Sequence, residues 1–83
     1  MSYKLFYSKT AFDDIKKLDS VARKRVKKKI ETYSQNPLSH AKKLVDSKIG
    51  NFRWRVGKYR VVFDIRDKDI LILRIGHRRE IYR

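Results

Sequence analysis

The feature that most constrains the fold is a change in hydrophobic spacing on either side of Pro37, the only proline in the chain. Before it, apolar residues recur every three or four positions, as they do along one face of an α-helix. After it, from Phe52 to Ile65, apolar and polar residues largely alternate, which is typical of strands with one buried face. Helical segments followed by a run of strands predict an α+β domain.

The N-terminal part of the chain predicts a short strand followed by two helices. Residues 3–7, with the sequence YKLFY, are rich in aromatic residues and indicate the strand. Ser8 or Thr10 can cap the first helix, and Asp19 with Ser20 can cap the second. Apolar side chains share one face of each helix: Ala11, Ile15 and Leu18 in the first, and Ala22, Val26, Ile30 and Tyr33 in the second. We therefore expect a tight helical hairpin whose apolar faces cover a sheet.

Three strands are predicted after a polar loop at residues 34–40. Their ranges are 52–56, 59–65 and 70–75. Turns are expected at two dipeptides, Gly57-Lys58 and Asp67-Lys68. The last strand is almost continuously apolar, which is typical of the centre of a sheet. We expect Gly76 to end this strand and residues 77–83 to form a short polar tail.

The predicted order is β-α-α-β-β-β, an antiparallel meander packed on an N-terminal helical hairpin. The chain has 83 residues with no internal repeat and no linker, so we expect a single domain over residues 1–83. A domain of this size buries only about 60% of its unfolded surface. Little room remains for a deep cofactor pocket, and we expect a shallow functional site that faces solvent.

The charge balance predicts a polyanionic partner. The chain has 23 Lys and Arg against 9 Asp and Glu, which gives a formal net charge of +14. Such an excess repels itself and lowers the stability of the compact state. Nucleic acid is the first candidate, because cationic side chains neutralise phosphates and release counterions. An anionic membrane is the second candidate, and an acidic protein, which can coexist with nucleic acid, is the third.

The composition also limits the cofactors and the location. The chain has no Cys, which excludes disulfides and thiolate metal sites. Asp13 and Asp14 are expected in the first turn of a helix, where the helix dipole favours acids, and Asp67 and Asp69 bracket a turn. Neither pair has the spacing of metal ligands, so we expect no metal and no cofactor. No run of 18 apolar residues occurs, and we expect a soluble cytoplasmic protein without a membrane partner.

The densest run of positive charge lies in the second predicted helix. It fills six of the seven positions from 23 to 29, with Arg23, Lys24, Arg25, Lys27, Lys28 and Lys29. One interpretation is the solvated face of an amphipathic helix. The other is an electrostatic rail for RNA or a docking surface for an acidic partner. The side chains point around much of the helix, so they cannot all converge on one phosphate.

Arg53, Arg55 and Arg60 form a more informative cluster. Residues two apart on a strand share a face, so Arg53 and Arg55 lie opposite the apolar residues between them. If the apolar sets face the helices, the three guanidinium groups converge on one open face of the sheet. Like charges this close lower stability unless an anion binds among them. Arginine also makes bidentate contacts to phosphate, although an ordinary polar outer face remains the alternative.

The C-terminal stretch, GHRREIYR, combines a histidine with arginines and a phenol. His77 is the best proton-transfer candidate in the chain, because imidazole exchanges protons near neutral pH. It follows the last strand directly, a place from which it could reach the arginine face, although a lone histidine near a C-terminus is more often incidental. His40 lacks such neighbours in the sequence, and we interpret it as a loop residue.

Two stretches resemble motifs of the RelE family of toxin ribonucleases. Residues 52–63, FRWRVGKYRVVF, are similar to the central motif of the family, and residues 75–82, IGHRREIY, are similar to its C-terminal ending. The helical hairpin and the spacing between the motifs also agree, so the resemblance covers essentially the whole chain. The two motifs in this order are more specific than either one alone.

The resemblance implies a toxin of a type II toxin–antitoxin system. Such a toxin cleaves messenger RNA in the A site of the 30S ribosomal subunit, inhibits translation, and is silenced by an acidic antitoxin with which it forms an oligomer. By motif position, the site residues that the resemblance implies are Arg53, Arg55, Arg60, Arg78 and Tyr82. Together with the candidates from the sequence itself, we expect the catalytic residues to be Arg60, Arg78, His77 and Tyr82. We expect the RNA-binding residues to be Arg53, Arg55, Lys58 and Arg79.

Arg53 and Arg55 depart from the family, since its best-studied members carry Lys at these positions. Because arginine effectively cannot lose its proton, neither residue is expected to act as a general base. His77 is the expected substitute, and whether it acts as base or acid stays open. Two other functions also stay open: a ParE-like toxin that binds DNA gyrase without nuclease chemistry, and an inactive homologue that only binds nucleic acid.

Overall fold

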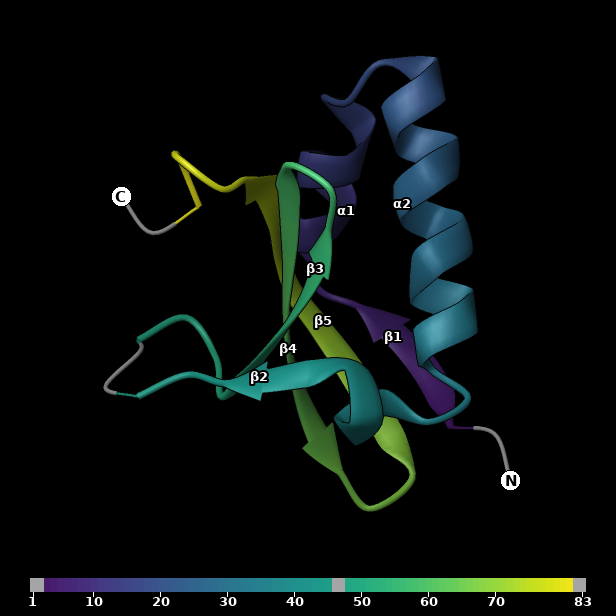
Figure 1. Cartoon of the computed structure of the whole chain (residues 1–83), viewed down its shortest axis with the longest axis vertical. Coiled ribbons are helices and arrows are strands. Elements are labelled where there is room, and N and C mark those ends of the chain that lie inside the picture. Colours follow the sequence, from purple (N-terminus) through teal and green to yellow (C-terminus); the bar gives the residue numbers. More distant parts are fainter. Residues whose placement is uncertain (1–2, 46–47, 82–83) are drawn as a thin grey trace.

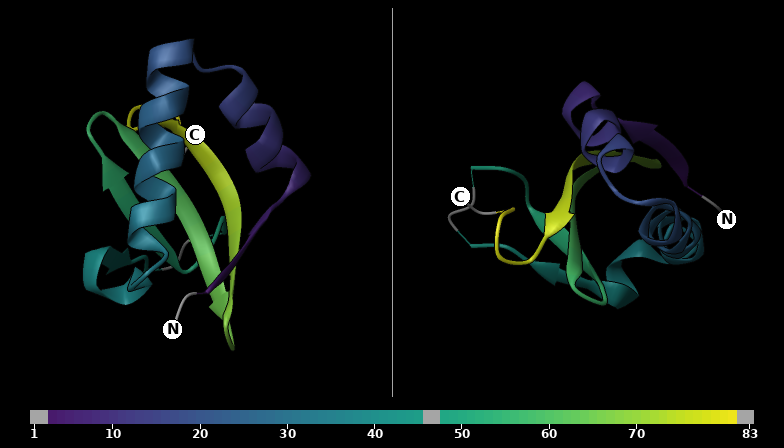
Figure 2. Two further views of the ribbon diagram at one scale, coloured as in Figure 1. Left: turned by 90° about the vertical axis from the view of Figure 1, so that its right-hand side faces the viewer. Right: turned by 90° about the horizontal axis from the view of Figure 1, so that it is seen from above.

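Two helices pack against one face of a five-stranded sheet in the computed structural model of the chain (Figure 1). The structure describes residues 3–45 and 48–81. The predicted α+β class is confirmed, and both helices cover the same side of the sheet (Figure 2). In chain order the elements are β1 (Lys4–Tyr7), α1 (Lys9–Lys16), α2 (Ser20–Tyr33), the 3₁₀-helix η1 (Pro37–His40), β2 (Ala41–Lys43), β3 (Phe52–Val56), β4 (Tyr59–Arg66) and β5 (Asp69–His77).

The sheet is mixed, with the strands in the order β1-β5-β4-β3-β2. Strands β2 to β5 pair antiparallel with their neighbours along the chain, as a meander requires. The N-terminal strand β1 instead pairs parallel with β5. The apolar strand β5 is therefore hydrogen-bonded on both sides, as its composition predicts, while β4 lies in the middle of the five.

Two elements were not predicted, and one predicted boundary was wrong. The polar loop contains η1, and residues 41–43 extend the sheet as β2, although their sequence AKK has no apolar alternation. Strand β5 does not end at Gly76, because Gly76 pairs with Arg60 in β4. The segment after β5 is not a solvated tail either, since Ile81 is 1% exposed and packs near Gly76.

The predicted helix caps are confirmed. Ser8 Oγ accepts a hydrogen bond from the Ala11 N–H at 3.0 Å, and Asp19 Oδ1 accepts one from the Ala22 N–H at 2.8 Å. The helices contain 8 and 14 residues, and none in the described ranges is long and apolar enough to cross a bilayer. Their apolar faces meet the sheet in one core that contains Ala11, Ile15, Val26, Ile30, Trp54, Val56, Val61, Phe63, Ile70, Ile72 and Ile75.

Two side chains with polar groups lie in the core or at its edge, those of Trp54 and Tyr7. Trp54 is fully buried, and its Nε1–H donates to the Pro37 carbonyl at 3.0 Å, which ties η1 to β3. The phenol of Tyr7, at the end of β1, is half-buried. Burial, helped by the negative charge of Glu31, raises the pKa of Tyr7 above its ordinary value.

Asp14 is not a simple helix-start residue, contrary to the expectation from sequence. It is 8% exposed, and its Oδ2 accepts hydrogen bonds from the Ile75 N–H and from Arg74 Nε, each at 2.9 Å. The pairing of β1 with β5 stops at Tyr7 and Ile72, so the rest of this edge of β5 has no strand partner. Asp14 satisfies a backbone N–H of that edge and anchors α1 to it.

Replacing Asp14 by alanine should lower the free energy of unfolding by about 1.5–3 kcal/mol. The substitution leaves a buried backbone N–H without its charged acceptor, which is the reason for an effect of this size. Asp13 is exposed on the same helix, so Asp13→Ala is the matched control and should change stability by about 0.5 kcal/mol or less. Denaturant unfolding checks both, and equal losses in the two variants would contradict the anchoring role.

Candidate functional site: a basic rim at the β3–β4 turn

A tight turn between β3 and β4 organises the candidate site. Val56 and Tyr59 form the strand pair that flanks it, and Gly57 and Lys58 form its two-residue tip. Gly57 has a φ of +57°, a left-handed conformation that glycine adopts without the steric penalty of a side chain. The turn predicted from Gly57-Lys58 is therefore present, and it sets the register of the arginines on either side.

The register brings Arg53, Arg55 and Arg60 to one face of the sheet. Arg55 lies directly opposite Arg60, and Arg53 lies opposite Val62. Trp54 and Val61, the intervening pair, are buried on the helix side. The shared face follows from alternation, but the prediction of an open face holds only in part, because Arg55 is exposed whereas Arg53 is half-buried.

Arg60 departs furthest from the expected open position, since it is only 7% exposed. Its Nη1 donates to the carbonyl oxygens of Gly57 and Tyr59, each at 3.0 Å. Hydrogen bonds from a charged donor are about twice as strong as neutral ones. Arg60 therefore braces the turn from beneath and contributes a fixed positive charge under it.

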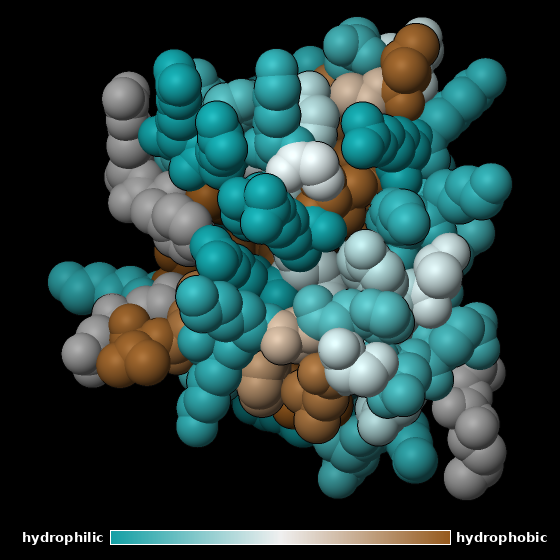
Figure 3. Space-filling model, in the orientation of Figure 1, coloured by the Kyte–Doolittle hydropathy of each residue, from teal (hydrophilic) through white to brown (hydrophobic). Residues whose placement is uncertain are grey.

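The C-terminal segment docks on the same turn. The Arg78 N–H donates to the Lys58 carbonyl at 2.8 Å, so the residue after β5 lies beside the turn tip. The side chains of Arg78, Lys58 and Arg55 are exposed. We call these three residues together with Arg60 the basic rim. The face of the molecule that carries the turn and α2 is covered mainly by hydrophilic side chains (Figure 3).

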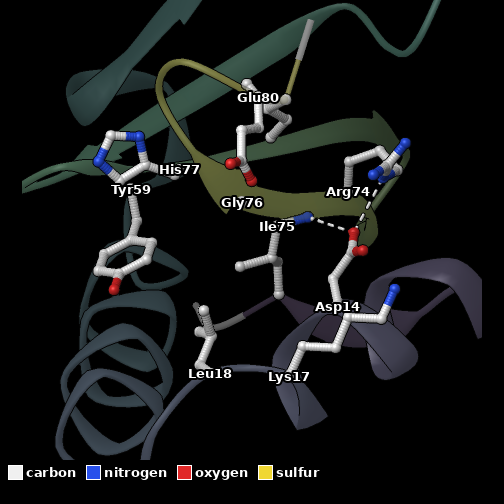
Figure 4. A pocket seen from close by; sticks show the side chains of 10 residues that line it. Asp14, Lys17, Leu18, Tyr59, Arg74, Ile75, Gly76, His77 and Glu80 are labelled. Carbon is white, nitrogen blue, oxygen red and sulfur yellow. Dashed lines mark hydrogen bonds and ion pairs between the residues drawn. The ribbon is translucent and has the colours of Figure 1, made fainter. Parts of the chain in front are cut away.

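His77 lies on the other side of the sheet from Arg55 and Arg60. It pairs with Tyr59 across the strands, and these two rings meet edge-on with centroids 6.1 Å apart (Figure 4). The interpretation that His77 could reach the arginine face is therefore wrong. Successive residues of a strand point to opposite faces of the sheet. Gly76, which pairs with Arg60, therefore faces the same side as Arg60, and His77 faces the other.

One nitrogen of His77 is already engaged. Its Nδ1 accepts a hydrogen bond from the Arg79 N–H at 3.2 Å. An imidazole nitrogen that accepts carries no proton of its own, so the hydrogen of the neutral ring is on Nε2. This bond helps to hold the turn after β5, and any proton transfer through Nδ1 requires that it open. The exposed side chain of Arg79 lies at this same turn.

A hollow of about 370 Å³ opens between α1, the end of β5 and the C-terminal turn (Figure 4). Its lining residues are Asp14, Lys17, Leu18, Tyr59, Arg74, Ile75, Gly76, His77, Glu80 and Ile81. His77 and Tyr59 stand at one side of this hollow and the Asp14–Arg74 ion pair at the other. The hollow therefore adjoins the basic rim but lies on the helix side of the sheet.

The basic residues of α2 make different contacts. Arg23 donates from Nε and Nη2 to carbonyl oxygens at the end of α1, those of Ile15, Lys16 and Leu18, at 3.0–3.3 Å. Lys29 lies over the ring of Tyr33, which also stacks on His40 at 4.4 Å, so His40 is not an isolated loop residue. Arg25 reaches the β3–β4 turn, a contact that no sequence signal distinguished from the rest of the run.

Tyr82, implied as a catalytic residue by the C-terminal motif, lies outside the residues that the structure describes. Within residues 3–45 and 48–81, no three His, Asp or Glu side chains gather closely enough to hold a metal ion.

The comparisons with known proteins agree on one family. The sequence profile of the family described as ParE toxin of type II toxin-antitoxin system, parDE, matches residues 5–82. Toxin RelE3 of Methanocaldococcus jannaschii is 32% identical over 83 residues, which cover 95% of this chain and 94% of that protein.

Solved structures lead to the same group. The RelBE2 toxin–antitoxin complex of Mycobacterium tuberculosis contains a chain with a TM-score of 0.85 and 31% identity, matched over 94% of this chain and 100% of that one. The RelB–RelE complex of Methanococcus jannaschii contains one with a TM-score of 0.73 and 32% identity, over 93% and 94% of the two chains. By sequence and by fold, the chain belongs to the RelE/ParE superfamily of type II toxin–antitoxin toxins.

Proposed function

We propose that the chain is a ribosome-dependent endoribonuclease that cleaves messenger RNA in the A site and so inhibits translation. The observation that carries this proposal is the basic rim. Three exposed cationic side chains, from Arg55, Lys58 and Arg78, surround one turn that the buried Arg60 braces. An exposed positive edge suits a phosphodiester backbone that must approach while it is held by another large assembly.

RNA supplies its own nucleophile, the 2′-hydroxyl. The protein therefore needs only to orient the RNA backbone, to move protons and to stabilise the charge that develops on the phosphate. The 2′-oxygen attacks the adjacent phosphorus, its proton passes to a base, and the bond from phosphorus to the 5′-oxygen breaks. The leaving 5′-oxygen then takes up a proton. The products are a 2′,3′-cyclic phosphate and a 5′-hydroxyl, and negative charge develops on the phosphoryl oxygens in between. Fixed cations beside those oxygens lower the barrier.

The proposed roles follow from exposure and position. Arg78 contacts the scissile phosphate directly, and Arg60 keeps the turn in shape while adding its charge from beneath. Arg55 and Lys58 hold the flanking backbone. The half-buried Arg53 and the exposed Arg79 are proposed to make weaker RNA contacts.

His77 is proposed to move the proton. It lies at the end of β5, one residue before Arg78, and can act through Nδ1 once RNA binding displaces the Arg79 N–H. Tyr82 is proposed to stack on a base or to orient the phosphate, in line with its place in the C-terminal motif.

A cognate acidic antitoxin is the proposed protein partner in the cytoplasm. The similar chains named above were solved as toxin–antitoxin complexes, which supports such a partner for this chain. A formal charge of +14 also favours an acidic polypeptide that covers the rim and blocks RNA.

A gyrase-binding toxin without nuclease chemistry is the second candidate. The match of residues 5–82 to the ParE toxin profile is the specific observation that favours it. The two candidates predict different cellular damage, so one induction experiment separates them.

Inducing the chain in growing cells should produce new messenger RNA 5′ ends within translated codons. These ends should disappear when initiation is blocked before induction, because cleavage requires RNA held in the ribosomal A site. Mapping 5′-hydroxyl ends genome-wide is the measurement, and cells that express Arg78→Ala at the same level are the control. Growth arrest with intact messages and inhibited DNA supercoiling would instead support the gyrase candidate.

A further inference from the structure

Arg25 of α2 packs directly against the β3–β4 turn. If Gly57 carried a Cβ atom, that atom would lie 3.2 Å from Arg25 Nη2, 3.4 Å from Cζ and 3.6 Å from Nη1. The guanidinium of Arg25 therefore lies within contact distance of the space that a side chain at position 57 would occupy. Glycine at this position serves two needs, the positive φ of the turn and the space for Arg25.

Two guanidinium groups consequently flank a single turn residue. Arg60 donates to the Gly57 carbonyl, and the guanidinium of Arg25 lies 3.2–3.6 Å from the position that a Cβ atom of the same residue would take. Arg25 comes from the helix side of the sheet, whereas Arg55 and Arg60 come from the opposite face. Like charges held this close repel, and the arrangement is most stable when an anion lies beside them.

The guanidinium of Arg25 is also available to a ligand. The side chain is exposed, and within residues 3–45 and 48–81 it makes no hydrogen bond or ion pair. By contrast, the guanidinium of Arg23, two residues earlier, donates hydrogen bonds to carbonyl oxygens at the end of α1. Arg25 thus lies at the edge of the rim with a fork of N–H donors for which no residue of the described ranges supplies an acceptor.

We propose that Arg25 binds a phosphate of single-stranded RNA and carries the RNA path from the basic rim over the turn onto α2. The proposal rests on the proposed ribonuclease function and adds a residue that the motifs do not contain. Arg55, Lys58 and Arg25 then offer cations in succession from the outer face, the tip and the helix side of one turn. A flexible strand can follow such an edge, and a planar guanidinium suits each phosphate.

The test is the salt dependence of binding to an unstructured ten-nucleotide RNA, measured by fluorescence anisotropy. For single strands, each phosphate contact contributes about 0.7 to the slope of log affinity against log salt. Arg25→Ala should make the slope shallower by about 0.7 and weaken binding about fivefold at 0.1 M salt. Arg25→Lys retains the charge and should retain most of the slope.

Lys27→Ala is the matched control. Lys27 is exposed on the same helix, but two residues on from Arg25 it points about 200° around the axis, away from the turn. The Lys27→Ala substitution removes the same charge as Arg25→Ala and should leave the slope of log affinity against log salt nearly unchanged. Thermal melting of each variant separates loss of contact from loss of fold, since Arg25→Lys and Lys27→Ala are expected to melt as the parent does.

The outcomes distinguish this proposal from the function on which it rests. If Arg55→Ala lowers the slope and Arg25→Ala behaves as Lys27→Ala does, the RNA site stands and the role of Arg25 is wrong. If neither Arg55→Ala nor Arg25→Ala changes the slope, the rim does not bind RNA and both proposals fail. Loss of binding to polyglutamate, with RNA binding intact, would assign Arg25 to an acidic protein partner and overturn the proposal.

Discussion

Replacing Arg78 by alanine should slow RNA cleavage by about 10²–10³-fold while the fold survives. Losing one preorganised contact to the charge that develops in the transition state has an effect of this size. The link between this segment and the turn is the Arg78 backbone N–H bonded to the Lys58 carbonyl, which alanine preserves. The measurement is single-turnover cleavage on ribosomes programmed with a short message.

Arg78 is a sharper test than Arg60, although both match the family motif. Arg60→Ala would also remove two hydrogen bonds that brace the turn, so a loss of activity would not separate chemistry from folding. Arg78→Lys should recover part of the rate because the charge returns without the planar fork. An Arg78→Ala protein that arrests growth fully at matched expression would show that the scissile phosphate is held elsewhere.

Replacing His77 by asparagine or by glutamine should slow RNA cleavage by about 10²-fold or more. Neither asparagine nor glutamine can carry a proton between oxygen atoms, and general acid–base catalysis contributes at least this much. The measurement is the same single-turnover assay, run on the parent and on both variants.

The two amides also separate chemistry from structure. The Oδ1 of asparagine stands near the position of Nδ1 and can still accept from the Arg79 N–H, whereas glutamine best replaces the Nε2–H donor. If His77→Asn stays within tenfold of the parent while His77→Gln does not, the ring only fixes the turn after β5. The proton-transfer group would then have to be sought among the other residues of the site.

Much of the fold was predictable because it rests on local patterns. The caps at Ser8 and Asp19 need only a hydroxyl or carboxylate before a helical stretch. The alternation around Trp54 fixes which side chains are buried, and Gly57-Lys58 marks the turn. The pairing of Arg55 with Arg60 follows from these two local signals alone.

Contacts between distant segments were not predictable in the same way. The sequence AKK at residues 41–43 carries no strand signal, and it becomes β2 because the edge of β3 offers unpaired backbone groups. Asp14 looks like an acid in a first helical turn, but the free edge of β5 draws it into the interior. Each of these outcomes depends on a partner some ten to sixty residues away.

The same distinction between local patterns and distant contacts applies to the candidate site. The sequence by itself identified the chemical groups of the candidate site: the motifs contain the arginines and the histidine, and the net charge of +14 favours a polyanionic partner. Only the tertiary structure decided the geometry, which buries Arg60 beneath the turn, turns His77 to the helix side and brings Arg25 to Gly57. The physical reason is that residue type and spacing fix charge and strand face, whereas burial and proximity arise only when α2, β4 and the C-terminal segment pack around one turn.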